Sequence, residues 1–233
     1  DIPLNGIKIL DLIVEPTDDG PSGDHALWIT PQIEYMEIIP SIISTSYQGK
    51  GPEVSSGTEK KLLDKIKRLP QQGLPLENTS FDWLLQPSRS KAGIYATPDG
   101  KSILLSNGMV ARMFRVLPNL STLDIFNRMT GESMLRAVSS EGSLTIDGKR
   151  WELGGLAGQP ERGYFQMEWV EQMTTRSGSF LIEDFRIEEL QEDIKWARSR
   201  WALNKNVPTG KRLTFVLKGE KETEGVTVEL HYD

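Results

Sequence analysis

The sequence predicts an all-β protein, an antiparallel β-sandwich of supersandwich type with one short connecting helix. Three observations favour this class. After Phe81, short runs rich in β-branched and aromatic residues recur roughly every 8 to 12 residues. Asn-Gly and Asp-Gly pairs at 107–108 and 147–148 separate some of these runs, and such pairs favour the positive φ values of tight hairpins. A single segment, 58–69, has the apolar spacing of a confident helix.

Composition limits the classes of function. The chain has 233 residues, which allows one large all-β domain or two smaller ones. It has no cysteine, so disulfides, thiolate metal sites and cysteine nucleophiles are excluded. Its net charge of −6 argues against nucleic acid or an anionic membrane as the main partner, because both require clustered Lys and Arg. No apolar run approaches the length of a membrane span, so no span is expected.

Residues 1–45 are predicted to form a β segment. Two strand-like runs flank the turn-rich stretch PTDDGPSGD, and two strands alone are too few for an independent module. Asp18, Asp19 and Asp24 in this stretch offer oxygen ligands that suit Ca²⁺ as a cofactor. The stretch lacks the spacing of an EF-hand, and Asx-type turns explain the same residues; we favour the turns.

Residues 46–80 are predicted to be a linker that contains a helix at about 58–69. Its beginning is polar and rich in glycine. Thr58 or Ser56 is the expected N-cap, and Pro70 ends the helix. Four apolar residues share one helical face: Leu62, Leu63, Ile66 and Leu69.

Residues 81–233 are predicted to form the sandwich domain. The segment 142–153 is typical of a hairpin that turns at Asp147-Gly148. The segment 154–163, GGLAGQPERG, is predicted to be a loop in which glycine lets the backbone bend tightly; it matches neither the dinucleotide fingerprint nor the P-loop. The other expected strands lie at 93–98, 102–107, 109–117, 121–128, 133–138, 178–187, 211–219 and 225–233. The last of these alternates and is expected to have four apolar residues on one side: Val226, Val228, Leu230 and Tyr232.

The tryptophans are the most informative candidates for ligand binding. An indole face can stack on the apolar face of a sugar, but large aromatic residues are also the normal filling of a sandwich core. We expect core positions for most of the six, which are Trp28, Trp83, Trp151, Trp169, Trp196 and Trp201. The candidate carbohydrate site is the strip of aromatic and cationic residues formed by Trp196, Trp201, Arg198 and Arg200; the alternative is that this strip covers a neighbouring domain.

The search for catalytic residues gives no candidate. His25 and His231 lie near opposite ends of the chain, and no G-x-S-x-G nucleophile motif is present. Glycoside hydrolysis uses two carboxylates that face each other across a sugar. We expect the carboxylates to lie on strand faces and turns, although sequence alone cannot show which of them converge: Glu141, Asp147, Glu152, Glu161, Glu168, Glu171, Glu183 and Asp184.

Four stretches carry a resemblance to a known family: LSNGMVARMFRV, LTIDGKRWELGGLAGQPERGYFQMEW, VPTGKRLTFVLKG and VTVELHYD. Together they resemble the N-terminal, non-catalytic β-supersandwich region of bacterial α-galactosidase-like glycoside hydrolases, near glycoside hydrolase family 36. The upstream DHALW resembles part of a galactose-binding-like module, which implies a partial module at 1–45. The resemblance also implies that 188–203 is irregular to extended, against its helix propensity.

The resemblance carries over no catalytic residue. In such proteins the two catalytic aspartates lie in a downstream (β/α)₈ barrel, which takes about 250 residues. Both ends of the chain look cut, so we expect a fragment of a longer protein. The expectation is an accessory region of a bacterial glycoside hydrolase, secreted, periplasmic or at the cell surface, whose partners are carbohydrate and its own catalytic barrel.

Two other readings remain open. The first alternative is a free-standing carbohydrate-binding or cell-surface adhesion protein, which requires an exposed aromatic face. The second is an independent lyase or hydrolase that uses carboxylates on a sandwich, which requires a deep cleft with a perturbed carboxylate.

Overall fold

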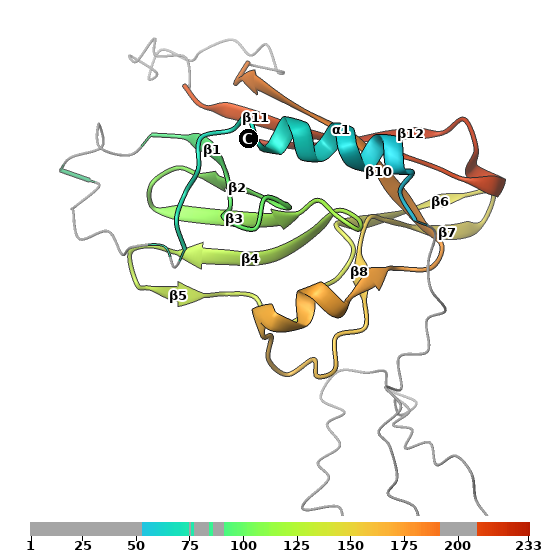
Figure 1. Ribbon diagram of the computed structural model, residues 1–233, viewed down its shortest axis with the longest axis horizontal. Coiled ribbons are helices and arrows are strands. Elements are labelled where there is room, and N and C mark those ends of the chain that lie inside the picture. The colour runs from blue at the N-terminus through green and yellow to red at the C-terminus, as the bar shows by residue number, and fades with distance from the viewer. Residues whose placement is uncertain (1–52, 75, 77–83, 86–90, 192–208) are drawn as a thin grey trace, which may run out of the picture. The chain divides into compact units, whose positions relative to one another are not determined.

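The computed structural model describes residues 53–74, 76, 84–85, 91–191 and 209–233. The chain divides into two contact units, Asp1–Tyr47 and Gln48–Asp233, and the described residues belong to the second. They form two five-stranded sheets, one two-stranded ribbon and one α-helix (Figure 1). The prediction of an all-β, sandwich-like fold is confirmed.

The first sheet is an antiparallel meander in which each strand pairs with the next one in the chain. Its strands are β1 (Gly93–Ala96), β2 (Ser102–Ser106), β3 (Val110–Arg115), β4 (Ser121–Asn127) and β5 (Glu132–Ser133). The predicted turn between β2 and β3 is present, and another turn joins β1 to β2. In these turns Gly100 and Gly108 have φ values of 65° and 89°, which glycine adopts at no steric cost.

The second sheet has the order β12-β11-β10-β7-β6. Its strands are β6 (Gly142–Ile146), β7 (Lys149–Leu153), β10 (Ser179–Glu189), β11 (Lys211–Lys218) and β12 (Thr227–Tyr232). β10 runs parallel to β7 and antiparallel to β11. The predicted hairpin at 142–153 is confirmed, because Ile146 pairs with Lys149 across a two-residue turn in which both residues have positive φ.

The main core lies between the two sheets and takes in the helix. Ile103 and Phe114 of the first sheet and Phe180 and Phe215 of the second belong to one buried cluster. The predicted alternation in the last strand is confirmed. Its four apolar side chains, Val226, Val228, Leu230 and Tyr232, all pack against this cluster.

A second core covers the other face of the first sheet. Neighbouring residues of β2 point to opposite sides, so Ile103 belongs to the main core and Leu104 to the second. Three short elements run over or beside this face: β8 (Leu156–Ala157), the 3₁₀ helix η2 (Met167–Gln172) and β9 (Thr174–Thr175). Another 3₁₀ helix, η3 (Lys221–Thr223), lies between β11 and β12.

The helix α1 spans Ser56–Ile66, so it begins two residues earlier and ends three residues earlier than predicted. Neither Thr58 nor Ser56 is its N-cap. The cap is Ser55, whose Oγ accepts a hydrogen bond from the Thr58 backbone N–H at 3.3 Å. The helix contacts β10, and Leu62 and Ile66 are fully buried in the main core.

The strand expected at 133–138 is wrong apart from Ser133. Leu135 and Val138 pack into the second core instead, and the Val138 N–H bonds the side chain of Gln159 rather than a neighbouring strand. The extended conformation expected for 188–203 holds in the structure as far as Glu189, where β10 ends. Residues 192–208, which make up most of that segment, lie outside the described residues.

The glycine-rich segment after β7 is a loop, as predicted, apart from the two residues of β8, which pair with β9. Gly154 has a φ of 65°, and a Cβ at this position would lie 2.4 Å from the Leu120 carbonyl oxygen. Gly155 donates its N–H to the same oxygen at 2.6 Å. Glycine is therefore required here by a close approach of two backbone segments as well as by the bend itself.

Candidate functional site

The site residues predicted from sequence lie outside the described residues. These are Trp196, Trp201, Arg198 and Arg200 for carbohydrate and Asp18, Asp19 and Asp24 for calcium. Within the described ranges, 53–74, 76, 84–85, 91–191 and 209–233, no three His, Asp or Glu side chains gather in a way that could hold a metal ion. In the same part of the chain, no helix is long and apolar enough to cross a membrane.

Several candidate carboxylates are held by cations. Asp184 accepts from Lys65 at 2.6 Å and lies 3.0 Å from Lys61, so it ties β10 to α1. Burial acts to raise the pKa of Asp184, but hydrogen bonds from these two lysines outweigh it and lower the pKa. On β7, Glu152 lies 3.4 Å from Arg150 and also accepts from the Ser140 hydroxyl.

The carboxylate of Glu141 is buried, since its side chain is 1% exposed. It accepts hydrogen bonds from Arg112 Nη2 at 2.8 Å, from the Thr122 N–H at 2.5 Å and from the Tyr232 hydroxyl at 2.5 Å. The Arg112 guanidinium also lies over the rings of Phe114 and Tyr232. These four residues, Glu141, Arg112, Thr122 and Tyr232, form what we call the Glu141 cluster. Their hydrogen bonds connect β3, β4 and β12.

A second charged group surrounds Arg115, whose side chain is 4% exposed. It donates to Asp99 and to Glu171, each at 2.7 Å, and Lys101 donates to the other oxygen of Glu171 at 2.7 Å. Hydrogen bonds from Lys101 and Arg115 lower the pKa of Glu171. The Arg115 cluster fastens η2 to the first sheet.

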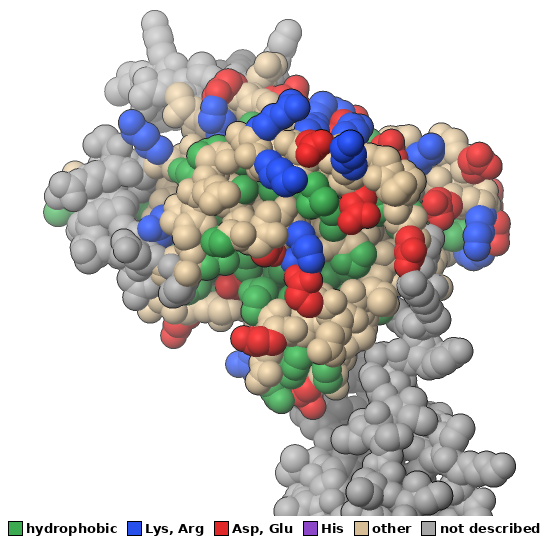
Figure 2. All heavy atoms as spheres, viewed as in Figure 1, with side chains coloured by type: hydrophobic (Ala, Val, Ile, Leu, Met, Phe, Trp, Pro, Cys, Tyr) green, Lys and Arg blue, Asp and Glu red, His purple; other side chains and the backbone are tan. Residues whose placement is uncertain are grey.

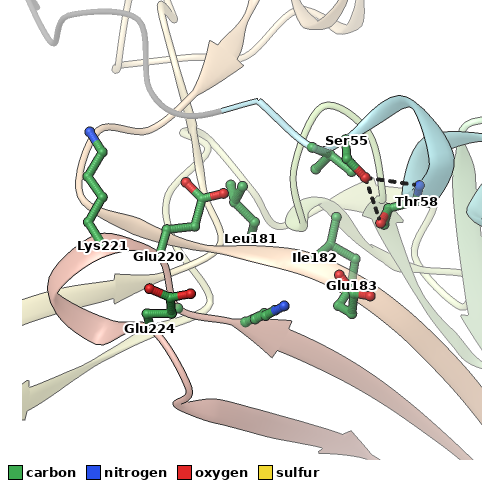
Figure 3. Close-up of a pocket in the computed structure, with 11 residues that line it drawn as sticks. Ser55, Thr58, Leu181, Ile182, Glu183, Glu220, Lys221 and Glu224 are labelled. Carbon is green, nitrogen blue, oxygen red and sulfur yellow. Dashed lines mark hydrogen bonds between the residues drawn. The ribbon is translucent and has the colours of Figure 1, made fainter.

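A hollow of about 510 Å³ lies beside the N-terminus of α1 (Figure 3). Glu183, Glu220 and Glu224 line it together with the N-cap Ser55, and Lys221 points away from the other labelled side chains. The acidic lining and the positive end of the helix dipole offset each other. The hollow therefore has no clear preference for an anion or a cation.

The candidate functional site is the segment 158–170, which we call the aromatic loop. Tyr164 and Trp169 form a tilted pair with ring centroids 5.3 Å apart and an interplanar angle of 49°. The Tyr164 side chain is 53% exposed, Met167 is also exposed, and Trp169 is half-buried. Figure 2 shows hydrophobic and acidic side chains gathered at the lower end of the molecule, where Figure 1 places this loop and η2.

Gln159 organises the aromatic loop. Its Oε1 accepts the Val138 N–H at 2.8 Å, while its Nε2 donates to the carbonyls of Arg136, Glu161 and Tyr164. One amide side chain therefore fixes both ends of the turn and joins it to the segment after β5. The loop is also anchored from below, because Phe165 packs on the second core and Val170 is buried in it.

Sequence reasoning treated Trp169 as one of six similar tryptophans and did not single out Tyr164. The structure separates the two tryptophans that it describes. Trp151 is half-buried against the main core, with Lys149 Nζ 4.3 Å from its ring centroid. Trp169 instead pairs with an exposed tyrosine. The Pro-Glu-Arg-Gly turn just before Tyr164 was the available clue, because such a turn lies at the surface.

In comparisons with known proteins, no family model, no curated protein and no solved structure gives a significant match to this chain.

Proposed function

We propose that this chain is an accessory, non-catalytic β-sandwich region of a secreted, α-galactosidase-like glycoside hydrolase. In this role it supports the catalytic barrel of the same protein and contacts carbohydrate. The all-β, sandwich-like fold supports the proposal, because the resemblance to the region near glycoside hydrolase family 36 implies a β-sandwich. The proposal assigns hydrolysis to the barrel, which has its own pair of carboxylates.

One observation carries the proposal. The segment 144–169, which is one of the four stretches that carry the resemblance, forms a hairpin and a loop that the fold itself needs. Gly154 and Gly155 meet the Leu120 carbonyl, and the Gly155 carbonyl accepts the Arg176 N–H at 3.1 Å. The residues that resemble the family therefore have structural roles of the kind expected in a supporting domain.

The buried charges support the same proposal. Glu141 accepts hydrogen bonds from one guanidinium, two hydroxyls and a backbone N–H. A carboxylate that attacks a substrate needs access to it, and the Glu141 side chain is 1% exposed. These contacts and this burial support a structural role, in which Glu141 joins the two sheets.

An assay of the full chain tests the proposal. We expect no turnover of aryl-α-galactosides, other aryl-glycosides or uronate polymers at high protein concentration. Turnover that survives purification and falls in a Glu171→Gln or Glu183→Gln variant would instead support a sandwich enzyme. A second measurement is whether the reading frame continues past residue 233 into a barrel of about 250 residues.

The exposed aromatic pair favours one alternative, a free-standing carbohydrate-binding protein. Both functions allow sugar binding, so binding does not separate them. The reading frame does: a frame that ends near residue 233 favours the alternative, and a frame that continues into a barrel favours the accessory region.

A further inference from the structure

We propose that the aromatic loop binds a neutral hexopyranose unit of a polysaccharide, with Tyr164 and Trp169 as its stacking surface. The inference deepens the proposed function and rests on it, because it names the residues and the ligand class of the carbohydrate contact. It assigns this contact to the aromatic loop instead of to Trp196, Arg198, Arg200 and Trp201, the candidates from the sequence, which lie outside the described residues.

The aromatic pair has the geometry of a small binding surface. The two rings contact each other at 49°, so they form an angled wall rather than a flat stack. The tilt leaves more than half of Tyr164 open to solvent, although Phe165 beside it packs on the second core. A pyranose presents an apolar face of C–H groups to which an exposed aromatic ring is complementary.

Polar side chains around the rings suit the hydroxyl groups of a sugar. Glu161, Arg162, Gln166 and Glu168 are all exposed and lie in the same short segment as the two rings, and polar and apolar residues alternate from 166 to 169. Their carboxylate, guanidinium and amide groups are planar and can bond two neighbouring hydroxyls at once. The combination of an apolar ring and planar polar groups within one short segment favours a sugar over a purely apolar ligand.

The aromatic loop is also preorganised. Gln159 fixes it through four hydrogen bonds, and the Glu161 side chain accepts the Gly163 N–H at 2.8 Å inside the turn. Binding therefore requires little ordering of the backbone, which is a major cost of binding for loops that are not held in place.

The size of the surface favours a sugar over a protein. A stable protein interface buries roughly 800 Å² on each partner and takes about 20 to 30 residues a side. In the aromatic loop the exposed apolar side chains are Tyr164 and Met167, with Trp169 half-buried beside them. These few side chains are too few for such an interface, whereas a single sugar ring can be bound by one or two aromatic side chains.

Affinity electrophoresis of the full chain in gels that contain galactomannan, arabinogalactan or β-glucan tests the inference. We expect retardation in at least one gel, and a loss of affinity of about fivefold or more in Tyr164→Ala and Trp169→Ala. Tyr164→Phe keeps the ring and should keep most of the affinity. Ile187→Ala, which removes another exposed apolar side chain on β10, is the matched control and should bind like the wild type.

The outcomes separate the two proposals. Retardation that Tyr164→Ala removes and Tyr164→Phe restores, without turnover, supports both. Absence of retardation in all three gels, or equal retardation of Tyr164→Ala and wild type, overturns the sugar site and leaves the accessory role standing. A change in self-association upon Tyr164→Ala without sugar binding also overturns the sugar site, since the loop would then be a protein interface. Thermal unfolding of each variant shows that the fold is intact.

Discussion

Arg112 and Arg115 on β3 are three residues apart, and each forms an ion pair with one buried and one more exposed partner. The buried partner is the carboxylate in the first pair and the guanidinium in the second. In the Glu141 cluster the carboxylate is buried, with 1% of its side chain exposed, and Arg112 is 33% exposed. In the Arg115 cluster the guanidinium is buried, with 4% exposed, and its partners Asp99 and Glu171 are 39% and 57% exposed. The comparison shows that the cost of losing an ion pair depends on which charge remains in the interior.

The principle behind this difference is desolvation. A charge that keeps contact with water recovers its hydration when its partner is removed, whereas a buried charge does not. Removal of Arg112 leaves a buried carboxylate, and removal of Arg115 leaves two carboxylates that water can reach. The two variants should therefore differ in stability although both delete one arginine from the same strand.

The largest effect is expected for Arg112→Met, which conserves most of the volume and removes the charge. We expect a loss of about 3 kcal/mol in the free energy of unfolding, because Glu141 keeps only its neutral donors. Urea titration followed by tryptophan fluorescence measures it. Arg150→Met on β7, where the arginine is 71% exposed, is the control and should change stability by no more than about 0.5 kcal/mol. Similar losses in the two variants would contradict the importance of the buried carboxylate.

Arg115→Met should cost less, about 1 to 2 kcal/mol. Asp99 and Glu171 can be rehydrated, but the Leu117 carbonyl loses the bond from Arg115 Nε and stays without that donor. The same urea titration measures the loss. If Arg115→Met proves at least as damaging as Arg112→Met, the burial of the guanidinium rather than that of the carboxylate decides the cost.

The contribution of the Arg115 cluster to stability should also depend on pH in the acid range. Burial acts to raise the pKa of Asp99, but hydrogen bonds from Thr97, the Lys101 N–H and Ser102 and the charge of Arg115 outweigh it, so this pKa is lowered. A carboxylate with a lowered folded-state pKa contributes stability above its unfolded pKa of about 4 and loses it as the pH falls through the folded value. The stability difference between wild type and Arg115→Met should therefore shrink between about pH 5 and pH 2. An unchanged difference would argue against the charge of Arg115 as its source.

Tyr232→Phe removes one donor from the Glu141 cluster and should cost about 1 kcal/mol at neutral pH. Burial, followed by the charge of Glu141 and the hydrogen bond to it, raises the pKa of Tyr232 far above its usual range. A raised folded-state pKa contributes stability below the unfolded value of about 10 and loses it as the pH rises beyond that value. The difference between wild type and Tyr232→Phe should thus narrow above about pH 10, as urea titrations at pH 8 and pH 10.5 can show. A constant difference would contradict a raised pKa of Tyr232 in the folded state.

The two clusters also show how far sequence reasoning reaches. Alternation placed Val226, Val228, Leu230 and Tyr232 on one face of the last strand, and the structure confirms this because the period of a strand is a local property. The partnership of Tyr232 with Glu141 joins residues 91 positions apart in the chain. No local pattern records such a contact, so the sequence names Glu141 as a carboxylate without showing what it meets.

The aromatic loop gives the same lesson for the candidate site. The turn chemistry of 154–163 is local, and the prediction of a glycine loop is confirmed. The reason for Gly154 is the Leu120 carbonyl, and the order of the loop comes from Gln159 reaching back to Arg136 and Val138. These contacts bring the loop against residues that precede it in the chain by 21 positions or more. The exposure of Tyr164 therefore depends on tertiary packing and could not be predicted from its neighbours in sequence.

The smallest effect is expected at the rim of the Arg115 cluster. Lys101 and Glu171 form an ion pair at 2.7 Å, but their side chains are 42% and 57% exposed. Lys101→Met should therefore cost about 0.5 kcal/mol or less, and 0.5 M salt should remove most of that cost. In the Arg115→Met background the same substitution tests coupling through Glu171. If Lys101→Met lowers the stability more in that background than in the wild type, Lys101 and Arg115 are coupled through Glu171. A loss of about 2 kcal/mol in either background would contradict a weak, solvent-exposed ion pair between Lys101 and Glu171.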